Sequence, residues 1–350
     1  KIRDTIGKLI KCKKPSEDLI KIIKKHNAFI EESIPLNYFG FIENYKLKPE
    51  NRNFSATSLD ELFLKPYFYL LKRDWQIMEI DYEQSIGLDK GDFIHKILEI
   101  FGKNDGWYIN RKNHQKGIEL FNQLSEKFLQ NYSGSFRLNI EELFWTSPTL
   151  FENILNEDYE KTPNFIHLMS EGNFGKDSDD TFKELSLIHP KLGEINFKGK
   201  IDRVDISKDK KSILIQDYKT GKINWDKLEG EMSRQLFIYY LVLKNEYKNA
   251  LISVSYRSVR DINNYGFYSG FILEDTIENY FDLNLKNSKK HIFIEDLMDV
   301  ENQILNCFNP MLENQFHLFS ERNSNINLDS YYYLKAVSRI ESIKYLLTNN

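Results

Sequence analysis

The stretch that decides the fold is residues 194–221, Glu194-Ile-Asn-Phe-Lys-Gly-Lys-Ile-Asp-Arg-Val-Asp-Ile-Ser-Lys-Asp-Lys-Lys-Ser-Ile-Leu-Ile-Gln-Asp-Tyr-Lys-Thr-Gly221. Apolar and polar residues alternate from Ile195 to Asp202, which is the two-residue period of a half-buried strand. A polar turn at 207–211 follows, and then a β-branched run from Ile213 to Ile215. We therefore expect two antiparallel strands joined by a tight polar turn.

The register of this hairpin brings acidic residues together. With a two-residue loop at 209–210, Asp202 falls opposite Asp217, and Lys219 lies on the same face. Facing carboxylates repel each other, so a shared proton, a nearby ammonium or a divalent cation must offset their charge. Two carboxylates and an ammonium on one face suit metal-assisted phosphodiester hydrolysis. An ordinary salt-bridged hairpin would show the same spacing, so the spacing alone does not decide between them.

The sequence around these residues carries more information. Gly199-Lys-Ile-Asp-Arg-Val-Asp205 and Gln216-Asp-Tyr-Lys-Thr-Gly221 resemble the signatures G-x-I-D-R-I-D and D-Y-K-T-G of PD-(D/E)XK nucleases of the RecB/AddB type. The resemblance implies a restriction-endonuclease-like α/β fold, with a mixed central sheet flanked by helices. It also implies that Asp202 and Asp217 are catalytic residues that bind Mg²⁺ or Mn²⁺. Lys219 would be the catalytic lysine, and the carbonyl of Tyr218 would face the metal.

A helix predicted over residues 87–100 adds a third ligand type. His95 lies at the edge of its apolar stripe, where a lone histidine is ordinarily a core or surface residue. The segment resembles the family motif G-x-x-(I/V)-H-x-(I/V)-L-E, and this implies that His95 is a metal ligand. We expect Glu99 to be structural.

A second helix is predicted over residues 232–247, with Gln235 and Tyr239 on one face. Residues 233–241 resemble the Q-x-x-x-Y element that follows D-Y-K-T-G in the RecB type. The resemblance implies that Gln235 and Tyr239 position either the DNA backbone or the catalytic carboxylates, and that Arg234 attracts phosphate. The same helix is also expected to pack on the sheet.

Two further resemblances concern other parts of the chain. Residues 171–175 resemble the E-x-x-F-G strand that precedes the hairpin, and we keep Glu171 as a weak metal-site candidate because an edge-strand carboxylate ordinarily stays away from the metal. Residues 54–70 and 329–339 resemble the segments that carry four cluster-binding cysteines in many relatives. The corresponding residues cannot supply thiolates, so we expect no iron–sulfur cluster; they are Lys65, Asp329, Tyr332 and Ser338.

Composition limits the class of protein. The 350 residues carry a formal net charge of −4, so a DNA-binding surface must be a local patch. No apolar run is long enough to span a membrane, and the two cysteines form neither a disulfide framework nor a zinc motif. We expect a cytoplasmic protein with a helical N-terminal extension at 1–50. A nuclease domain at 51–350 would carry a helical insertion at about 105–165.

The function that these resemblances imply is metal-dependent DNA hydrolysis in repair or recombination. The protein would act as an exonuclease on DNA ends or single strands, either free-standing or as the nuclease part of an AddB-like subunit with a helicase partner. A catalytically inactive module that binds DNA ends or serves as a scaffold is the alternative. Cleavage of RNA also stays open.

Overall fold

The computed structural model describes residues 52–64, 66–74, 86–134, 137–138, 140–141, 149–175, 181–219, 234–259, 269–280, 292–294 and 299–313. Two compact units divide the chain. The larger comprises Pro49–Thr57 and Tyr82–Asn306, and the described residues of the smaller are 58–64, 66–74 and 307–313. The predicted extension at 1–50 lies outside the described residues, and so do the four positions that correspond to cluster cysteines.

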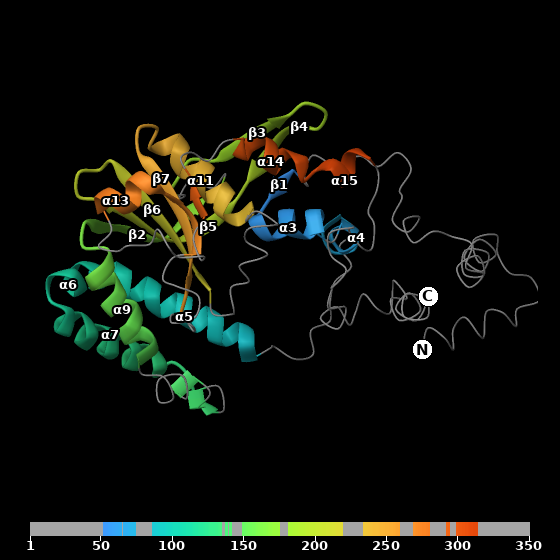
Figure 1. Ribbon diagram of the computed structural model, residues 1–350. Helices are drawn as coiled ribbons and strands as arrows, with labels where there is room; N and C mark the ends of the chain where they lie inside the picture. Colours follow the sequence, from blue (N-terminus) through green and yellow to red (C-terminus); the bar gives the residue numbers. More distant parts are fainter. Residues whose placement is uncertain are drawn as a thin grey trace, which may run out of the picture. The chain divides into compact units, whose positions relative to one another are not determined.

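A six-stranded mixed sheet is the framework of the larger unit (Figure 1). In spatial order its strands are β2 (Phe165–Phe174), β5 (Gly199–Ser207), β6 (Ser212–Lys219), β7 (Leu251–Ser258), β8 (Ser269–Leu273) and β9 (Ile292–Ile294). β6 pairs with β7 in parallel and β8 with β9 in parallel, while the other neighbours are antiparallel. The predicted mixed α/β fold is confirmed.

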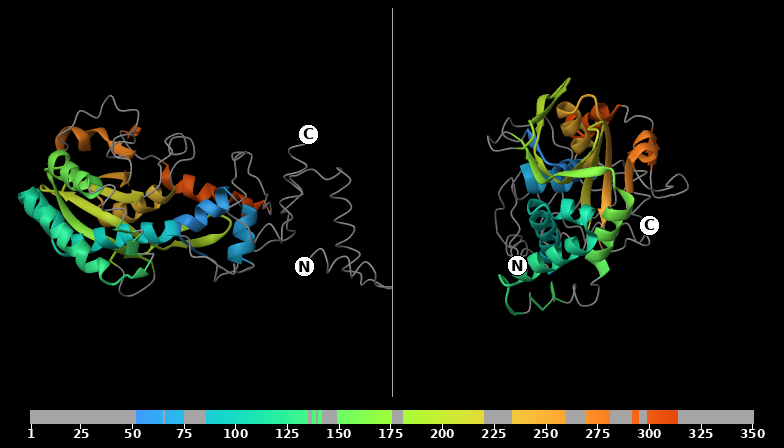
Figure 2. Two further views of the ribbon diagram at one scale, coloured as in Figure 1. Left: turned by 90° about the horizontal axis from the view of Figure 1, so that it is seen from below. Right: turned by 90° about the vertical axis from the view of Figure 1, so that its left-hand side faces the viewer.

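Helices cover both faces of this sheet (Figures 1 and 2). One group is α5 (Ile86–Lys103), α6 (Gly106–Lys112), α7 (His114–Leu129) and α9 (Thr149–Lys161); the other face carries α11 (Arg234–Glu246). Tyr218 of β6 belongs to the apolar cluster of the first group, whereas the preceding Asp217 is hydrogen-bonded to Gln235 of α11. Because successive strand residues point to opposite faces, the two helix groups lie on opposite sides.

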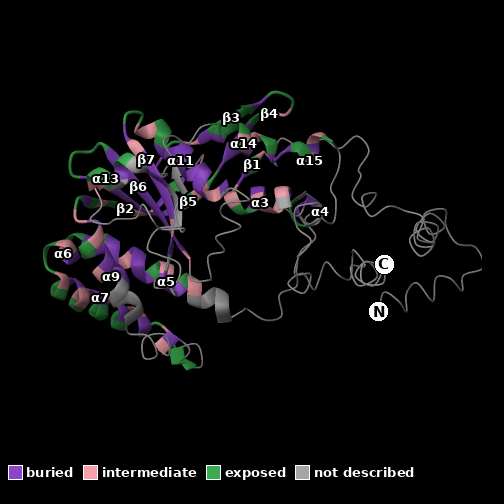
Figure 3. Cartoon of the chain, viewed as in Figure 1, coloured by how far each residue is buried: buried purple, intermediate pink, exposed green. Residues whose placement is uncertain are grey.

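Apolar packing explains why the first group holds together. Phe101 contacts Trp107 and Phe121 edge-on, with ring centroids 5.0 and 5.4 Å apart, and all three side chains are buried. Burying an aromatic side chain of this size contributes roughly 1.5–3 kcal/mol. Figure 3 shows the same burial continuing along β5, β6, β7 and α11. The amphipathic pattern predicted for 87–100 is confirmed, since Ile97 is fully buried.

The β5–β6 pairing has the predicted register. Arg203 pairs with Gln216, and continuing this antiparallel register by one residue places Asp202 opposite Asp217. The predicted two-residue loop is wrong, because β5 ends at Ser207 and β6 begins at Ser212. The Ser207 hydroxyl accepts the Ser212 N–H at 2.9 Å, which closes a longer turn without changing the register.

A second, three-stranded sheet belongs to the same unit. Its order is β1 (Asn53–Phe54), β4 (Gly193–Phe197) and β3 (Leu185–His189), with β1 parallel to β4. Two further helices of the unit are α13 (Glu274–Tyr280) and α14 (Val300–Asn306). Among the described helices, none has the length and apolar character needed to cross a membrane.

The described part of the smaller unit is helical. It consists of α3 (Ala56–Leu64) from Ser58 onward, α4 (Pro66–Tyr69), the π-helical segment η3 (Leu70–Asp74) and α15 (Asn309–Leu312). Within it, Glu61 of α3 accepts hydrogen bonds from Lys72 and Arg73 of η3, each at 2.9 Å.

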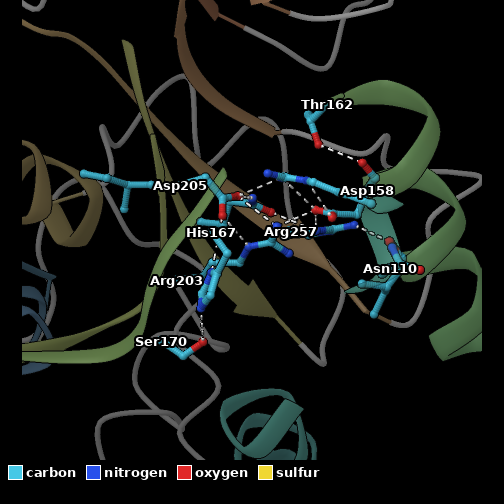
Figure 4. A network of polar contacts seen from close by, with 12 residues as sticks. Asn110, Asp158, Thr162, His167, Ser170, Arg203, Asp205 and Arg257 are labelled. Carbon is cyan, nitrogen blue, oxygen red and sulfur yellow. Dashed lines mark hydrogen bonds and ion pairs between the residues drawn. The ribbon is translucent and has the colours of Figure 1, made fainter. Parts of the chain in front are cut away.

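A buried charge network fixes β5 to the helices beneath it (Figure 4). Arg203 Nε donates to Asp205 Oδ1 at 3.0 Å, and its Nη2 contacts Asp158 of α9. The guanidinium also lies over the Trp107 ring, 3.7 Å from its centroid. Burial alone would raise the pKa of Asp205, but the charge of Arg203, together with His167 and Arg111, outweighs burial and lowers it. The carboxylate therefore stays ionised inside the protein.

The same network extends to β6 and β7. Gln216 Nε2 donates to Asp205 Oδ2 at 2.7 Å, and Arg257 Nη1 donates to Gln216 Oε1 at 2.9 Å. Arg257 Nη2 reaches the carbonyl of Ile154 in α9 at 2.7 Å. Arg203 and Asp205 therefore point to the opposite face of the sheet from Asp202, where they hold the strands to the helical layer.

Candidate active site

The two facing aspartates lie near one end of the β5–β6 pair. Both are buried, and the backbone N–H of Tyr218 donates to Asp202 Oδ2 at 2.7 Å. Burial raises the pKa of Asp217, the charge of Asp202 raises it further, and Lys219 opposes the shift, so that the pKa rises to about 7. At neutral pH the pair therefore holds a proton part of the time unless a cation balances its charge.

Lys219, Gln235 and Tyr239 form a chain of contacts on the Asp217 side. Lys219 Nζ lies 2.5 Å from Asp217 Oδ2 and donates to Gln235 Oε1 at 2.9 Å. Gln235 Nε2 donates to Asp217 Oδ1 at 2.8 Å and to Tyr239 Oη at 2.9 Å. Tyr239 Oη in turn donates to the carbonyl of Lys200 at 2.7 Å. These bonds fix the amide orientation of Gln235 and anchor α11 to both strands.

His95 and Glu171 complete the site on the Asp202 side. His95 Nδ1 lies 3.3 Å from Asp202 Oδ2 and 4.0 Å from Glu171 Oε1. One ligand atom from each of the three residues lies within 4.8 Å of the others. Burial would lower the pKa of His95, but its hydrogen bond to Asp202 and the charges of Asp202, Asp217 and Glu171 outweigh burial and raise it. The surroundings of the imidazole thus favour positive charge.

The backbone at Glu171 is strained. Its φ of 58° lies in the left-handed region, which costs a non-glycine residue about 1–3 kcal/mol. The flanking pairs Ser170–Arg203 and Gly172–Ile201 put Glu171 opposite Asp202. Burial and the charge of Asp202 raise the pKa of Glu171, although Lys200 opposes them from 2.5 Å. Such strain is typical of functional sites, and here it accompanies a carboxylate placed in the cluster.

The donor set fits a divalent cation. It combines one imidazole with carboxylates from β2 and β5, and such nitrogen and oxygen donors suit Mn²⁺ or Mg²⁺. Asp217 of β6 faces Asp202 but is not among the three residues whose ligand atoms converge, so its place as a ligand stays a prediction. Asp217 Oδ2 is buried, and its partner among the described residues is the Lys219 ammonium, 2.5 Å away. A bound cation would give this carboxylate a second positive partner.

The structure brings together six of the residues singled out from sequence, namely His95, Asp202, Asp217, Lys219, Gln235 and Tyr239. Glu171, only a weak candidate from sequence, joins them; the E-x-x-F-G pattern was its one signal. Arg234 begins α11 and is buried, and its phosphate contact stays a prediction. The Tyr218 ring packs edge-on to His95 with ring centroids 6.1 Å apart, while the role of its carbonyl also stays a prediction.

Glu99 has the structural setting expected of it. Its buried carboxylate accepts Lys96 Nζ at 2.7 Å and also contacts the Lys103 ammonium. These contacts lie one helical turn beyond His95 on α5. Glu99 is absent from the group whose ligand atoms converge.

Comparison with known families agrees with this geometry. Among curated proteins, none matches the chain. A family model described as the PD-(D/E)XK nuclease superfamily matches residues 53–295, which is more than half of the chain and includes every residue of the site. The chain therefore belongs to the PD-(D/E)XK nuclease superfamily.

Proposed function

We propose that the protein is a divalent-metal-dependent deoxyribonuclease of the RecB/AddB type that hydrolyses phosphodiester bonds at DNA ends or in single strands. The observation that carries this proposal is the convergence of His95, Glu171 and Asp202, with ligand atoms within 4.8 Å of one another. Asp217 faces this group across the hairpin, with Lys219 against it. Membership of the superfamily supports the same chemistry.

His95, Glu171, Asp202 and Asp217 would hold the cation, with the Tyr218 carbonyl as a further oxygen donor. The ion, whether Mg²⁺ or Mn²⁺, would supply positive charge that polarises the phosphate and lowers the pKa of water. Burial and the charge of Asp202 raise the pKa of Asp217, and the charges of Asp202, Asp217 and Glu171 act on His95, so added positive charge would stabilise the ionised carboxylates of this site.

Lys219 would act beside the nucleophile. Its ammonium lies 2.5 Å from Asp217 Oδ2, from where it can donate a hydrogen bond to the attacking water or to a phosphate oxygen that gains charge. Gln235 accepts a hydrogen bond from Lys219 and donates one to Asp217, so it holds the two at a fixed separation. Tyr239 fixes Gln235 and is a positioning residue, and Arg234 and Gln235 are the proposed contacts to the DNA backbone.

The RecB/AddB resemblance carries the finer parts of the proposal. It supports a role in DNA repair or recombination, a helicase subunit as partner and a nuclease domain at 51–350. These depend on the two hairpin signatures and on the ordered His95 and Gln235 motifs around them. The lack of an iron–sulfur cluster is proposed from Lys65, Asp329, Tyr332 and Ser338, and a cytoplasmic location from the two cysteines, which form no disulfide framework.

The proposal is tested with labelled single-stranded DNA, duplex DNA and RNA under titration of Mg²⁺ or Mn²⁺. We expect DNA cleavage that EDTA abolishes. Lys219→Ala should lower the rate by about 10²–10³-fold, by analogy with removal of a group that stabilises the transition state, while DNA affinity persists. The matched control is Lys211→Ala, an exposed lysine in the turn of the same hairpin.

Undiminished turnover in Lys219→Ala would remove this residue from the mechanism, and cleavage that resists EDTA would contradict the metal site. Binding of DNA ends without cleavage at any metal concentration would favour the alternative, an inactive end-binding or scaffold module. Cleavage of RNA alone would correct the substrate class.

A further inference from the structure

Three lysines contact two carboxylates: Glu99, and Glu171 of the metal-ligand group (His95, Glu171 and Asp202). Glu99 is 7% exposed, and its carboxylate contacts the ammonium groups of both Lys96 and Lys103. The two lysine side chains are themselves 51% and 62% exposed. Lys200 Nζ lies 2.5 Å from Glu171 Oε2, and half of the Lys200 side chain is exposed. Each ammonium is thus held by a carboxylate yet remains open to solvent.

The charges of Glu99 and its two lysine partners do not balance. One carboxylate, Glu99, is shared by two ammonium groups, which leaves one positive charge in excess. Burial would raise the pKa of Glu99, but its hydrogen bonds from Lys103 and Lys96 outweigh burial and lower it, so the carboxylate is ionised. An ion pair on a helix surface ordinarily has one lysine for each carboxylate. Here Lys96 and Lys103 share Glu99, so their like charges repel each other, and a bound anion would relieve this repulsion.

The lysines lie along one path that starts at the metal-ligand group. At its near end α5 contacts β2 through His95 and Glu171. One further contact lies at Gly102, where an added Cβ would be 2.1 Å from Ser170 Oγ. An added Cβ at Gly102 would also be 3.0 Å from His167 Nε2, so α5 runs beside β2 from Glu171 toward His167, over about 10 Å at 1.5 Å per residue.

Lys200 of β5 lies at the near end of this path, where its ammonium contacts Glu171. Its backbone pairs with Asn173 of β2. The hydrogen bond to Glu171 raises the pKa of Lys200 most strongly. The charges of Glu99 and Asp202 also raise it, so the Lys200 ammonium interacts with Glu99 as well as with Glu171.

We propose that Lys96, Lys103 and Lys200 form a phosphate track that holds the backbone of single-stranded DNA beside the cleavage site. The proposal rests on the proposed nuclease function for the identity of its ligand. Lys96 and Lys103 are available in the metal-free protein. Lys200 joins them only when a divalent cation binds Glu171, because the ammonium then loses its carboxylate partner and turns to a phosphate.

Phosphate contacts have a measurable signature, since each releases a counterion. For single strands, the slope of log K against log salt concentration changes by about 0.7 for each contact. Loss of two contacts should make the slope shallower by about 1.4 and weaken binding about 25-fold at about 0.1 M salt. Loss of one should change the slope by about 0.7 and affinity about fivefold.

The experiment measures fluorescence anisotropy of labelled oligothymidine over a salt series, with all proteins carrying Lys219→Ala to prevent turnover. The double variant Lys96→Gln/Lys103→Gln should show the change expected for two lost contacts, a shallower salt slope, both in Ca²⁺ and in EDTA. Lys200→Gln should show the change expected for one lost contact in Ca²⁺, and its salt slope should be unchanged in EDTA. The control, Lys116→Gln with Lys127→Gln, removes two exposed lysines of α7 and should leave the slope unchanged.

Unchanged slopes in the track variants, or an equal change in the control, would overturn the track. A loss in Lys200→Gln of equal size in EDTA would overturn the metal-dependent part. A cleavage assay of the same variants with Lys219 restored separates this inference from the proposed function. If the slopes change but the protein never cleaves, the track stands and the nuclease proposal fails. If the protein cleaves DNA but the slopes are unchanged, the nuclease proposal stands and the track fails.

Discussion

The raised pKa of Asp217 predicts how Asp217→Asn changes stability when no divalent cation is present. In the native protein the carboxyl has a pKa of about 7, against the ordinary value of 3.8 expected in the unfolded chain. Unfolding therefore releases a proton at any pH between the two values, and the contribution of Asp217 to stability falls as pH rises through this window.

The magnitude follows from the difference of 7 − 3.8 = 3.2 pKa units. At about 1.36 kcal/mol per unit, the free energy of unfolding should fall by about 4 kcal/mol between pH 4 and pH 8 because of this carboxyl. His95 and Glu171 also have raised native pKa values, so their contributions fall in the same direction. Asp205, with its lowered pKa, acts only on the acid side, where stability is lost as pH falls.

The assay is urea unfolding in EDTA at a series of pH values, for the parent protein and for Asp217→Asn. We expect the parent to lose stability from pH 4 to pH 8 and the variant to lose about 4 kcal/mol less, because Asn cannot ionise. Added Mn²⁺ should stabilise the parent far more than the variant. A parent protein whose stability stays flat or rises across this range, or a variant with the same slope, would show that Asp217 does not have a raised pKa in the folded protein.

Two further predictions concern other parts of the site and the layer beneath it. Glu171→Gln should weaken Mn²⁺ binding at least tenfold in calorimetry while the protein stays folded, because Glu171 lies among the proposed ligands; an unchanged affinity would remove it from that set. Arg203→Met should lower the free energy of unfolding by about 3–5 kcal/mol, since it leaves Asp158 and Asp205 buried without their main cation. Unfolding by urea measures this, and a loss below about 1 kcal/mol would show that Arg111 and Arg257 suffice.

Local pattern and signature were enough to predict much of the hairpin and its neighbours. The two-residue period and the turn residues fixed the register that sets Asp202 opposite Asp217. Helical spacing placed Gln235 and Tyr239 on one face, and their hydrogen bond follows from that spacing. These features depend on residues close together in sequence, where periodicity is informative.

What the sequence did not reveal depends on distant residues and on backbone geometry. Glu171 has a left-handed φ, and nothing in its residue type indicates this. The partners of Arg203 in the buried network include Asp158, which is 45 residues earlier in the chain. The prediction gave a two-residue loop in place of the four-residue turn, because the Ser207 side chain closes the turn. The same polar residues would be expected in either loop, so their composition does not distinguish the two.

The most direct test of the metal site is a crystal soaked in Mn²⁺ and measured for anomalous scattering. We expect one strong peak bonded to His95 and Asp202, with Glu171 and Asp217 as the remaining protein ligands and Lys200 released from Glu171. A peak bonded to other residues, or none at a concentration that supports cleavage, would contradict it.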